Sequence, residues 1–351
     1  MKKHLFFISI ILFSCQEEIT LELPQAETKL VVQGAIENGF PPYVVLTRNQ
    51  GYFEEINSDT YANLFVDDVD SVKVWYIDDN GEEISKHLGL LPPELSEIIT
   101  GEPMPLYTIT DAVELENAII NPGEYNFSQS GRTYYLEIKW NNKVITSSTT
   151  IPLATALDCL WVEQSETADE DFMYDIRAIY SDPAEQNNNL IIKSKRLQHY
   201  EINREDTSSC ETINYPDFSL KLIDAGSDIL INGQTFETYF PRPKDSGNPF
   251  PDGNYNSYHT KICDNDTLEF KEDIVLIKFC QIDEPSLKFW RGLVRQAGNN
   301  GNPFAEPMNL VSNINNGLGV FTGYGSVYYK VPIIKDTTIF EEYSPEIIDI
   351  F

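Results

Sequence analysis

The sequence consists largely of short runs of β-branched and aromatic residues, separated by clusters of Gly, Pro, Asn and Asp. In its first half these runs are KLVVQGAI, YVVLTRN, SVKVWYI, EYNFSQ, TYYLEIKW and KVITSSTTI. Apolar and polar residues alternate over residues 134–139, as in a strand with one buried face. Asn80-Gly81, between two runs, predicts a hairpin with a type I′ turn, because this dipeptide tolerates positive φ. The pattern therefore predicts a mainly β protein.

The spacing of the runs also predicts how the chain is divided. About seven strands over about 125 residues predict an immunoglobulin- or fibronectin-like β-sandwich at 28–152. Residues 153–351 are again rich in strand formers and are predicted to form a second antiparallel β domain. It contains one short helix, at 285–297, because acids and a Pro precede that segment and Gly298 follows it.

The N-terminus has the pattern of a bacterial secretory signal, predicted to span residues 1–14. Lys2 and Lys3 precede a short apolar run, which is far below the ~20 residues needed to cross a bilayer. The apolar run leads into the sequence Leu-Phe-Ser-Cys, which ends at Cys15. This sequence resembles a lipobox, in which the Cys becomes the acylated N-terminus. The alternative is an ordinary signal cleaved elsewhere. Residues 15–27 are polar and are predicted to be a tether.

The charge of the chain excludes some classes of partner. With 55 acidic and 25 basic side chains, the formal net charge is −30. Such a surface repels nucleic acid, which is bound through cationic contacts with phosphates. It also argues against direct docking on anionic headgroups, so membrane contact is expected through the N-terminal lipid. Aromatic residues make up 12% of the chain, too many for a disordered protein of this charge.

Four cysteines remain after Cys15: Cys159, Cys210, Cys263 and Cys280. An exported protein can form disulfides, and four cysteines allow three pairings. We favour a disulfide between Cys210 and Cys263 because both lie in polar, loop-like surroundings, whereas the other two lie in apolar runs. The alternative is that all four are reduced. No CxxC or Cys/His cluster indicates a metal site, and we expect no cofactor.

Three segments together resemble a known family. The lipobox is followed by LELPQAETKLVVQGAIENGFPPYVVLTRNQGYF and, near the end, by GNPFAEPMNLVSNINNGLGVFTGYG. These blocks resemble the Bacteroidota lipoproteins of domain-of-unknown-function family 4249. The resemblance implies an outer-membrane lipoprotein, lipidated at Cys15, whose gene often lies beside that of a TonB-dependent transporter. Gln16-Glu17-Glu18 resembles the acidic signal for export to the outer face in that phylum, so we expect the protein to face the exterior.

No catalytic set is visible in the sequence. His87, His199 and His259 are isolated, and neither a Gly-x-Ser-x-Gly elbow nor a phosphate-binding glycine loop is present. Asp67-Asp68 and Asp78-Asp79 are paired acids of the kind that a glycosidase uses, but adjacent acids in turns are usually solvated. The Asp264, Asp266 and Glu269 triplet lacks the frame of an EF-hand. We therefore expect no metal.

Two functions from different classes remain. The first is a non-catalytic binding or accessory module in nutrient uptake, partnered with a TonB-dependent outer-membrane barrel. Its expected contact residues lie in the long 298–319 loop: Phe304, Met308 and Leu310. The alternative is that this loop packs on its own domain beside the 285–297 helix. The second function is a surface hydrolase that acts on peptide or glycan through paired carboxylates.

Overall fold

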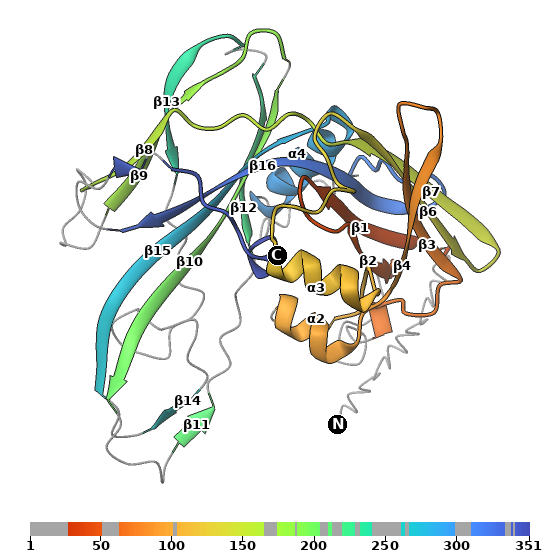
Figure 1. The fold of residues 1–351 in the computed structure, drawn as a ribbon, viewed down its shortest axis with the longest axis horizontal. Helices are drawn as coiled ribbons and strands as arrows, with labels where there is room; N and C mark the ends of the chain where they lie inside the picture. Colours follow the sequence, from red (N-terminus) through yellow and green to blue (C-terminus); the bar gives the residue numbers. More distant parts are fainter. Residues whose placement is uncertain are drawn as a thin grey trace, which may run out of the picture.

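The computed structural model describes most of the chain after the N-terminal segment. The described residues are 27–50, 63–100, 104–164, 174–186, 188–203, 210–212, 220–228, 232–240, 261–263, 267–298, 310–333, 338–339 and 341–351. Within them the protein is mainly β, as the sequence predicts, with a few short helices against the sheets (Figure 1).

One 11-stranded sheet runs through the described part of the molecule. Neighbouring strands are antiparallel, except that β1 and β16 run parallel. In sheet order the strands are β12 (Lys221–Ser227), β10 (Asn189–Asn203), β15 (Thr267–Ile282), β16 (Leu318–Pro332), β1 (Leu30–Glu37), β2 (Tyr43–Arg48), β5 (Leu106–Thr108), β4 (Glu83–Leu90), β3 (Ser71–Ile77), β6 (Thr133–Trp140) and β7 (Lys143–Thr150).

The strands from β1 to β7 curl into the predicted sandwich. Val32 and Leu46 on one side and Val74 on the other belong to a single buried core. On β6, Tyr134, Leu136 and Ile138 are buried, which confirms the predicted alternation over residues 134–139. Burying this one face of each strand fixes the register, because a slip by one residue would expose the whole apolar set.

The β3–β4 hairpin is confirmed, but its predicted turn type is wrong. Gly81 is the residue with a positive φ in this turn, at 81°, whereas a type I′ turn also needs positive φ at Asn80. Asp78 stabilises the observed turn, because its Oδ1 accepts hydrogen bonds from the backbone N–H groups of Asn80 and Glu82. The result is a three-residue loop that ends in a left-handed Gly.

Two helices within the sandwich segment were not predicted. They are α2 (Pro93–Thr100) and α3 (Ala112–Ile120), which lie side by side on one side of the sandwich strands (Figure 1). Local signals for both are present in the sequence. Pro93 occupies the first turn of α2, and the Asp111 side chain caps α3 by accepting from Glu114 N.

A second sheet covers one face of the long strands in the C-terminal half. It consists of β13 (Thr235–Phe240), β9 (Tyr174–Ser181), β8 (Cys159–Gln164) and β17 (Thr338–Ile339). Leu160 and Ile176 from this sheet pack with Val275, Ile277 and Phe279 of β15. A two-stranded ribbon, β11 (Cys210–Thr212) with β14 (Lys261–Cys263), lies near the far ends of β10 and β15 (Figure 1).

The opposite face of these strands is covered by the predicted helix, α4 (Glu284–Gly298). Leu287 and Trp290 on α4 are buried with Cys280 and Tyr324 from the strands. A short 3-10 helix, η2 (Ile347–Asp349), packs beside them near the C-terminus. Strands β10, β15 and β16 thus lie in the middle of three layers.

The main sheet contains strands from both sides of the predicted boundary at 152/153. Strand β16 comes from the C-terminal segment, yet it pairs with β1 from Val31↔Leu318 to Glu37↔Tyr324. Gly323 and Gly325 on β16 allow close approach, because a Cβ there would lie 2.6 Å from Thr150 O and 2.3 Å from Pro152 O. The two segments are therefore joined through β16.

Candidate functional site

The residues predicted to act from the long loop are only partly described. Phe304 and Met308, like Cys15, lie outside the described residues. Leu310 is described and half-buried, and a Cβ placed on Gly292 of α4 would lie 2.9 Å from its Cδ2. Leu310 therefore packs on the helix, as the alternative for this loop supposed.

The ribbon of β11 and β14 aligns the two cysteines of the favoured disulfide. Cys210 and Cys263 are direct partners in the antiparallel register. Directly opposed residues have Cα atoms about 4.5–5.5 Å apart, within the range that a disulfide can bridge. Cys159 and Cys280 are free thiols, and burial raises the pKa of the Cys280 thiol to about 11. The backbone is thus compatible with the prediction.

We expect peptide mapping without reductant to recover one peptide pair joined through Cys210 and Cys263. Replacing Cys210 by Ser should lower the free energy of unfolding by about 2–4 kcal/mol, because the unfolded chain loses a cross-link. The Cys159→Ser variant, at a free thiol, is the control and should leave the linked pair intact. Alkylation of both Cys210 and Cys263 in the denatured, unreduced protein would contradict the prediction.

An open pocket of about 660 Å³ lies between α3 and the β3–β4 hairpin, and we name it the α3 pocket. Tyr76, Ile84 and Lys86 line it from the hairpin strands, and the 121–127 segment lines it after α3. Its polar and aromatic lining residues are Tyr76, Lys86, Asp111, Glu114, Asn117, Asn121, Glu124, Tyr125, Asn126 and Phe127. No pattern in the sequence indicated this combination.

One acid of the α3 pocket joins its walls, and a second caps α3. Glu114 accepts from Lys86 Nζ at 2.5 Å and from Tyr125 Oη at 2.6 Å, which joins α3 to β4 and to the following loop. Asp111 Oδ1 accepts from Glu114 N at 2.9 Å as the helix cap. Burial, and then the hydrogen bond to Glu114, raises the pKa of Tyr125. This phenol therefore stays protonated as a donor to Glu114.

The aromatic wall of the pocket is fixed by ring contacts. Tyr76 meets Phe127 edge-to-face at 5.3 Å between ring centroids, and the guanidinium of Arg132 lies 3.9 Å from the Tyr76 centroid.

A smaller open pocket of about 470 Å³, lined in part by Arg132, contains the predicted acid pair Asp78-Asp79. Backbone hydrogen bonding, first from Glu82, lowers the pKa of Asp78, so this acid serves the turn. Asp67-Asp68 is exposed and lines neither pocket.

The amide groups of the α3 pocket are uncommitted. Asn117, Asn121 and Asn126 are exposed, and their side chains make no hydrogen bond within the described part of the chain. Each amide offers both donors and an acceptor. The pocket therefore presents polar groups that can bind a ligand, beside one acid, Glu114, that joins its walls.

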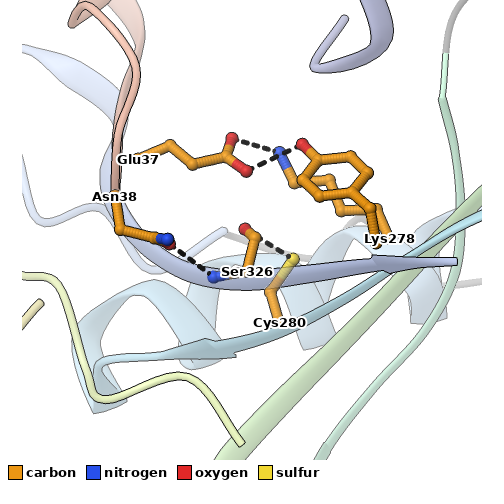
Figure 2. Close-up of polar contacts among 6 residues, drawn as sticks. Glu37, Asn38, Lys278, Cys280 and Ser326 are labelled. Atoms are coloured by element: carbon orange, nitrogen blue, oxygen red, sulfur yellow. Dashed lines mark hydrogen bonds and ion pairs between the residues drawn. The ribbon is translucent and has the colours of Figure 1, made fainter. Parts of the chain in front are cut away.

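A second polar cluster is fully buried between β1, β15 and β16 (Figure 2). Lys278 Nζ lies 2.5 Å from Glu37 Oε2, and Tyr328 Oη donates to Glu37 Oε1 at 2.7 Å. Glu37 is 2% exposed and Lys278 is 1% exposed. Ser326 lies alongside, where its hydroxyl donates to Cys280 Sγ at 3.3 Å. Burial, followed by the charge of Glu37, raises the pKa of Tyr328.

A further lysine lies close to this cluster. Lys193 Nζ lies 4.6 Å from the centroid of the Trp290 ring and 5.1 Å from that of Tyr324. Burial, and then the charge of Lys278, lowers the pKa of Lys193 to about 8. Because Glu37 and Lys278 are closed to solvent, we assign the buried cluster to stability rather than to ligand binding.

The comparisons with known proteins give a family for the chain. A family model described as a domain of unknown function, DUF4249, matches residues 16–329. The chain belongs to this family. The match spans both strand-rich segments and the joining β1–β16 pair of this DUF4249 protein. No curated protein and no solved structure matches it.

In the described part of this DUF4249 chain, no helix is both long enough and apolar enough to cross a membrane. Across the same residues, no three His, Cys, Asp or Glu side chains gather where they could hold a metal ion. The side chains of the Asp264, Asp266 and Glu269 triplet, and those of His199 and His259, lie outside the described part of the chain. His87 is exposed on β4.

The buried cluster was also missed from the sequence. Glu37 and Lys278 are 241 residues apart, and no local pattern connects them. One signal could have indicated it, since Lys278 interrupts the apolar run IVLIKFC of β15. A lysine on a strand that is buried on both faces requires an acid nearby.

Proposed function

We propose that this protein is an outer-membrane lipoprotein, exposed at the cell surface, that acts as a non-catalytic binding or accessory module. Its proposed partner is a TonB-dependent transporter, and its proposed role is in nutrient uptake. The observation that carries the proposal is the α3 pocket. Its amides make no hydrogen bond among the described residues, while Glu114 joins the walls and Asp111 caps α3. Such an arrangement suits reversible binding, because open clefts with a few convergent polar groups are typical ligand sites.

The N-terminal pattern supports the location. The basic start, short apolar run and lipobox ending at Cys15 favour acylation there. A diacylglyceryl group together with an amide-linked chain holds a protein stably on a membrane, since each buried CH₂ contributes about 0.8 kcal/mol. The net charge of −30 leaves this lipid as the proposed membrane contact. Gln16-Glu17-Glu18 supports the exterior face.

Exposed aliphatic side chains on α2 and on α3 support a protein partner. Ile98 on α2 is 69% exposed, and Ile120 at the end of α3 is 64% exposed. Exposed apolar side chains that gather on neighbouring elements often mark interaction sites. Acidic side chains on the same helices, Glu94, Glu97 and Glu116, would repel anionic headgroups. We therefore propose that this helix pair, which we name the α2–α3 surface, contacts the transporter, in addition to the proposed contacts from Phe304 and Met308.

The anchor is tested by replacing Cys15 with Ala. We expect the variant to leave the outer-membrane fraction, either as soluble protein or as uncleaved precursor, because the acyl chains are its proposed membrane hold. Cys159→Ala, at a free thiol, is the matched control and should fractionate as wild type. Protease added to intact cells should degrade the wild-type protein if it faces outward. A cleaved Cys15→Ala protein at wild-type levels in the outer membrane would contradict the anchor.

A surface hydrolase is the second candidate, and one observation favours it. Asp111 and Glu124 both line the α3 pocket, where one could act as acid and the other as base. A hydrolase would convert a bound peptide or glycan, and Glu124→Gln would abolish turnover while leaving binding. The binding module that we propose returns the ligand unchanged. Product analysis after prolonged incubation separates the two.

A further inference from the structure

We propose that the α3 pocket is a subsite for a neutral saccharide. This inference rests on the proposed binding function and gives the chemical class of its ligand. It is carried by three features of the pocket: uncommitted amides, aromatic rings in its walls, and a lone cation that is already paired.

The amides match the groups that a sugar presents. Asn117 lies near the end of α3, and Asn121 is the C-cap of the same helix; both line the pocket. Asn126 lines the same pocket from the following loop. A side-chain amide both donates and accepts, as do two neighbouring hydroxyl groups of a pyranose ring. These amides can therefore pair with hydroxyl groups without any change of charge.

The rings match the apolar face of a sugar. Tyr76 and Tyr125 are half-buried, and together with Phe127 they line the pocket. Contacts with Phe127 and Arg132 hold Tyr76 in place, so its ring is ordered before a ligand arrives. The C–H groups on one face of a pyranose can pack on such a ring, while the hydroxyl groups at its edge reach the amides. A pre-ordered wall lowers the entropic cost of binding.

The charges argue against other ligand classes. Of the residues that line the pocket, Lys86 is the only cation, and it is bound to Glu114. A phosphate, sulfate or uronate would therefore meet no free positive charge, in a chain with a net charge of −30. A fatty acyl chain would leave the amides and Glu124 without partners on desolvation. A basic peptide, bound through Glu124 and Asp111, is the competing ligand that the test must separate.

The test uses the purified mature chain and a broad array of neutral and acidic oligosaccharides, with trilysine as the cationic probe. We expect binding to neutral members, followed by calorimetric titration of the strongest one. Replacing Asn117 and Asn121 together with Ala should weaken that binding by about tenfold or more, because two hydrogen bonds to the ligand are lost. The control is Gln296→Ala, which removes an exposed amide from α4 and should leave the affinity unchanged.

Several outcomes would overturn the inference. Binding to no neutral saccharide would do so, as would preference for acidic members or for trilysine. Wild-type affinity in the Asn117→Ala, Asn121→Ala protein would place any sugar site elsewhere. If that protein does not fold, as judged by its melting temperature, Asn126→Ala alone provides the same test. A transporter complex without saccharide binding refutes this inference only, whereas saccharide binding without a complex refutes the proposed partner.

Discussion

Replacing Lys278 with Met is expected to lower the free energy of unfolding by about 3–5 kcal/mol, because it leaves the buried Glu37 carboxylate without its cation. Tyr328 would remain as the other hydrogen-bond donor to Glu37. The Lys278 side chain is 1% exposed, so water cannot replace the lost ion pair without opening the three-layer region. Urea denaturation, followed by circular dichroism at constant pH, measures the change.

Two further variants show whether the ion pair is responsible. Adding Glu37→Gln to Lys278→Met removes the orphaned charge, and it should restore much of the lost stability. Lys288→Met, which breaks the exposed pair with Glu284, should change stability by less than about 0.5 kcal/mol. Equal effects of Lys278→Met and Lys288→Met would show that the buried pair has no special role.

The second large effect is expected at Gly319, at the start of β16. Its φ is +100°, and an added Cβ would lie 2.0 Å from the carbonyl oxygen of Val32 on β1. Gly319→Ala should therefore destabilise the protein by at least about 2 kcal/mol, through backbone strain and steric overlap. Because the parallel β1–β16 pair joins the two segments, their unfolding should remain one cooperative transition at a lower midpoint.

A glycine of the same sheet provides the control. Gly226 lies on β12, where a Cβ would meet nothing within 4 Å. Gly226→Ala should raise stability slightly, by about 0.5–1 kcal/mol, because Ala loses less backbone freedom than Gly on folding. Thermal melts of both variants measure the contrast. A Gly319→Ala protein as stable as Gly226→Ala would mean that β1 and β16 do not approach as described.

Much of the fold follows from local sequence signals. Alternation over residues 134–139 predicts the buried face of β6, and the Pro and Gly around 285–297 predict α4. What local signals cannot supply is pairing between distant segments. The β1–β16 ladder joins Val31 to Leu318, and nothing near either residue encodes the other. The two overlooked helices are short, and their caps at Pro93 and Asp111 are weak signals on their own.

The candidate site was less predictable, because it depends on where turns and helices meet. Asn117 and Tyr76 are 41 positions apart in the sequence and lie on different elements, α3 and β3. Neither residue lies in a recognisable motif. Acids that looked chemically suggestive, such as Asp78-Asp79, serve a turn. Residue type alone could not separate a ligand-binding side chain from a structural one, since the two differ in which atoms already make hydrogen bonds within the protein.

Affinity purification from detergent-solubilised outer membranes tests the central claim most directly. The account predicts that the lipidated protein brings down a TonB-dependent transporter, identified by mass spectrometry. It also predicts that replacing Ile98 and Ile120 with Ser on the α2–α3 surface removes the transporter without lowering the melting temperature. Recovery of the wild-type protein alone, from cells in which the transporter is made and with crosslinking before solubilisation, would contradict the account.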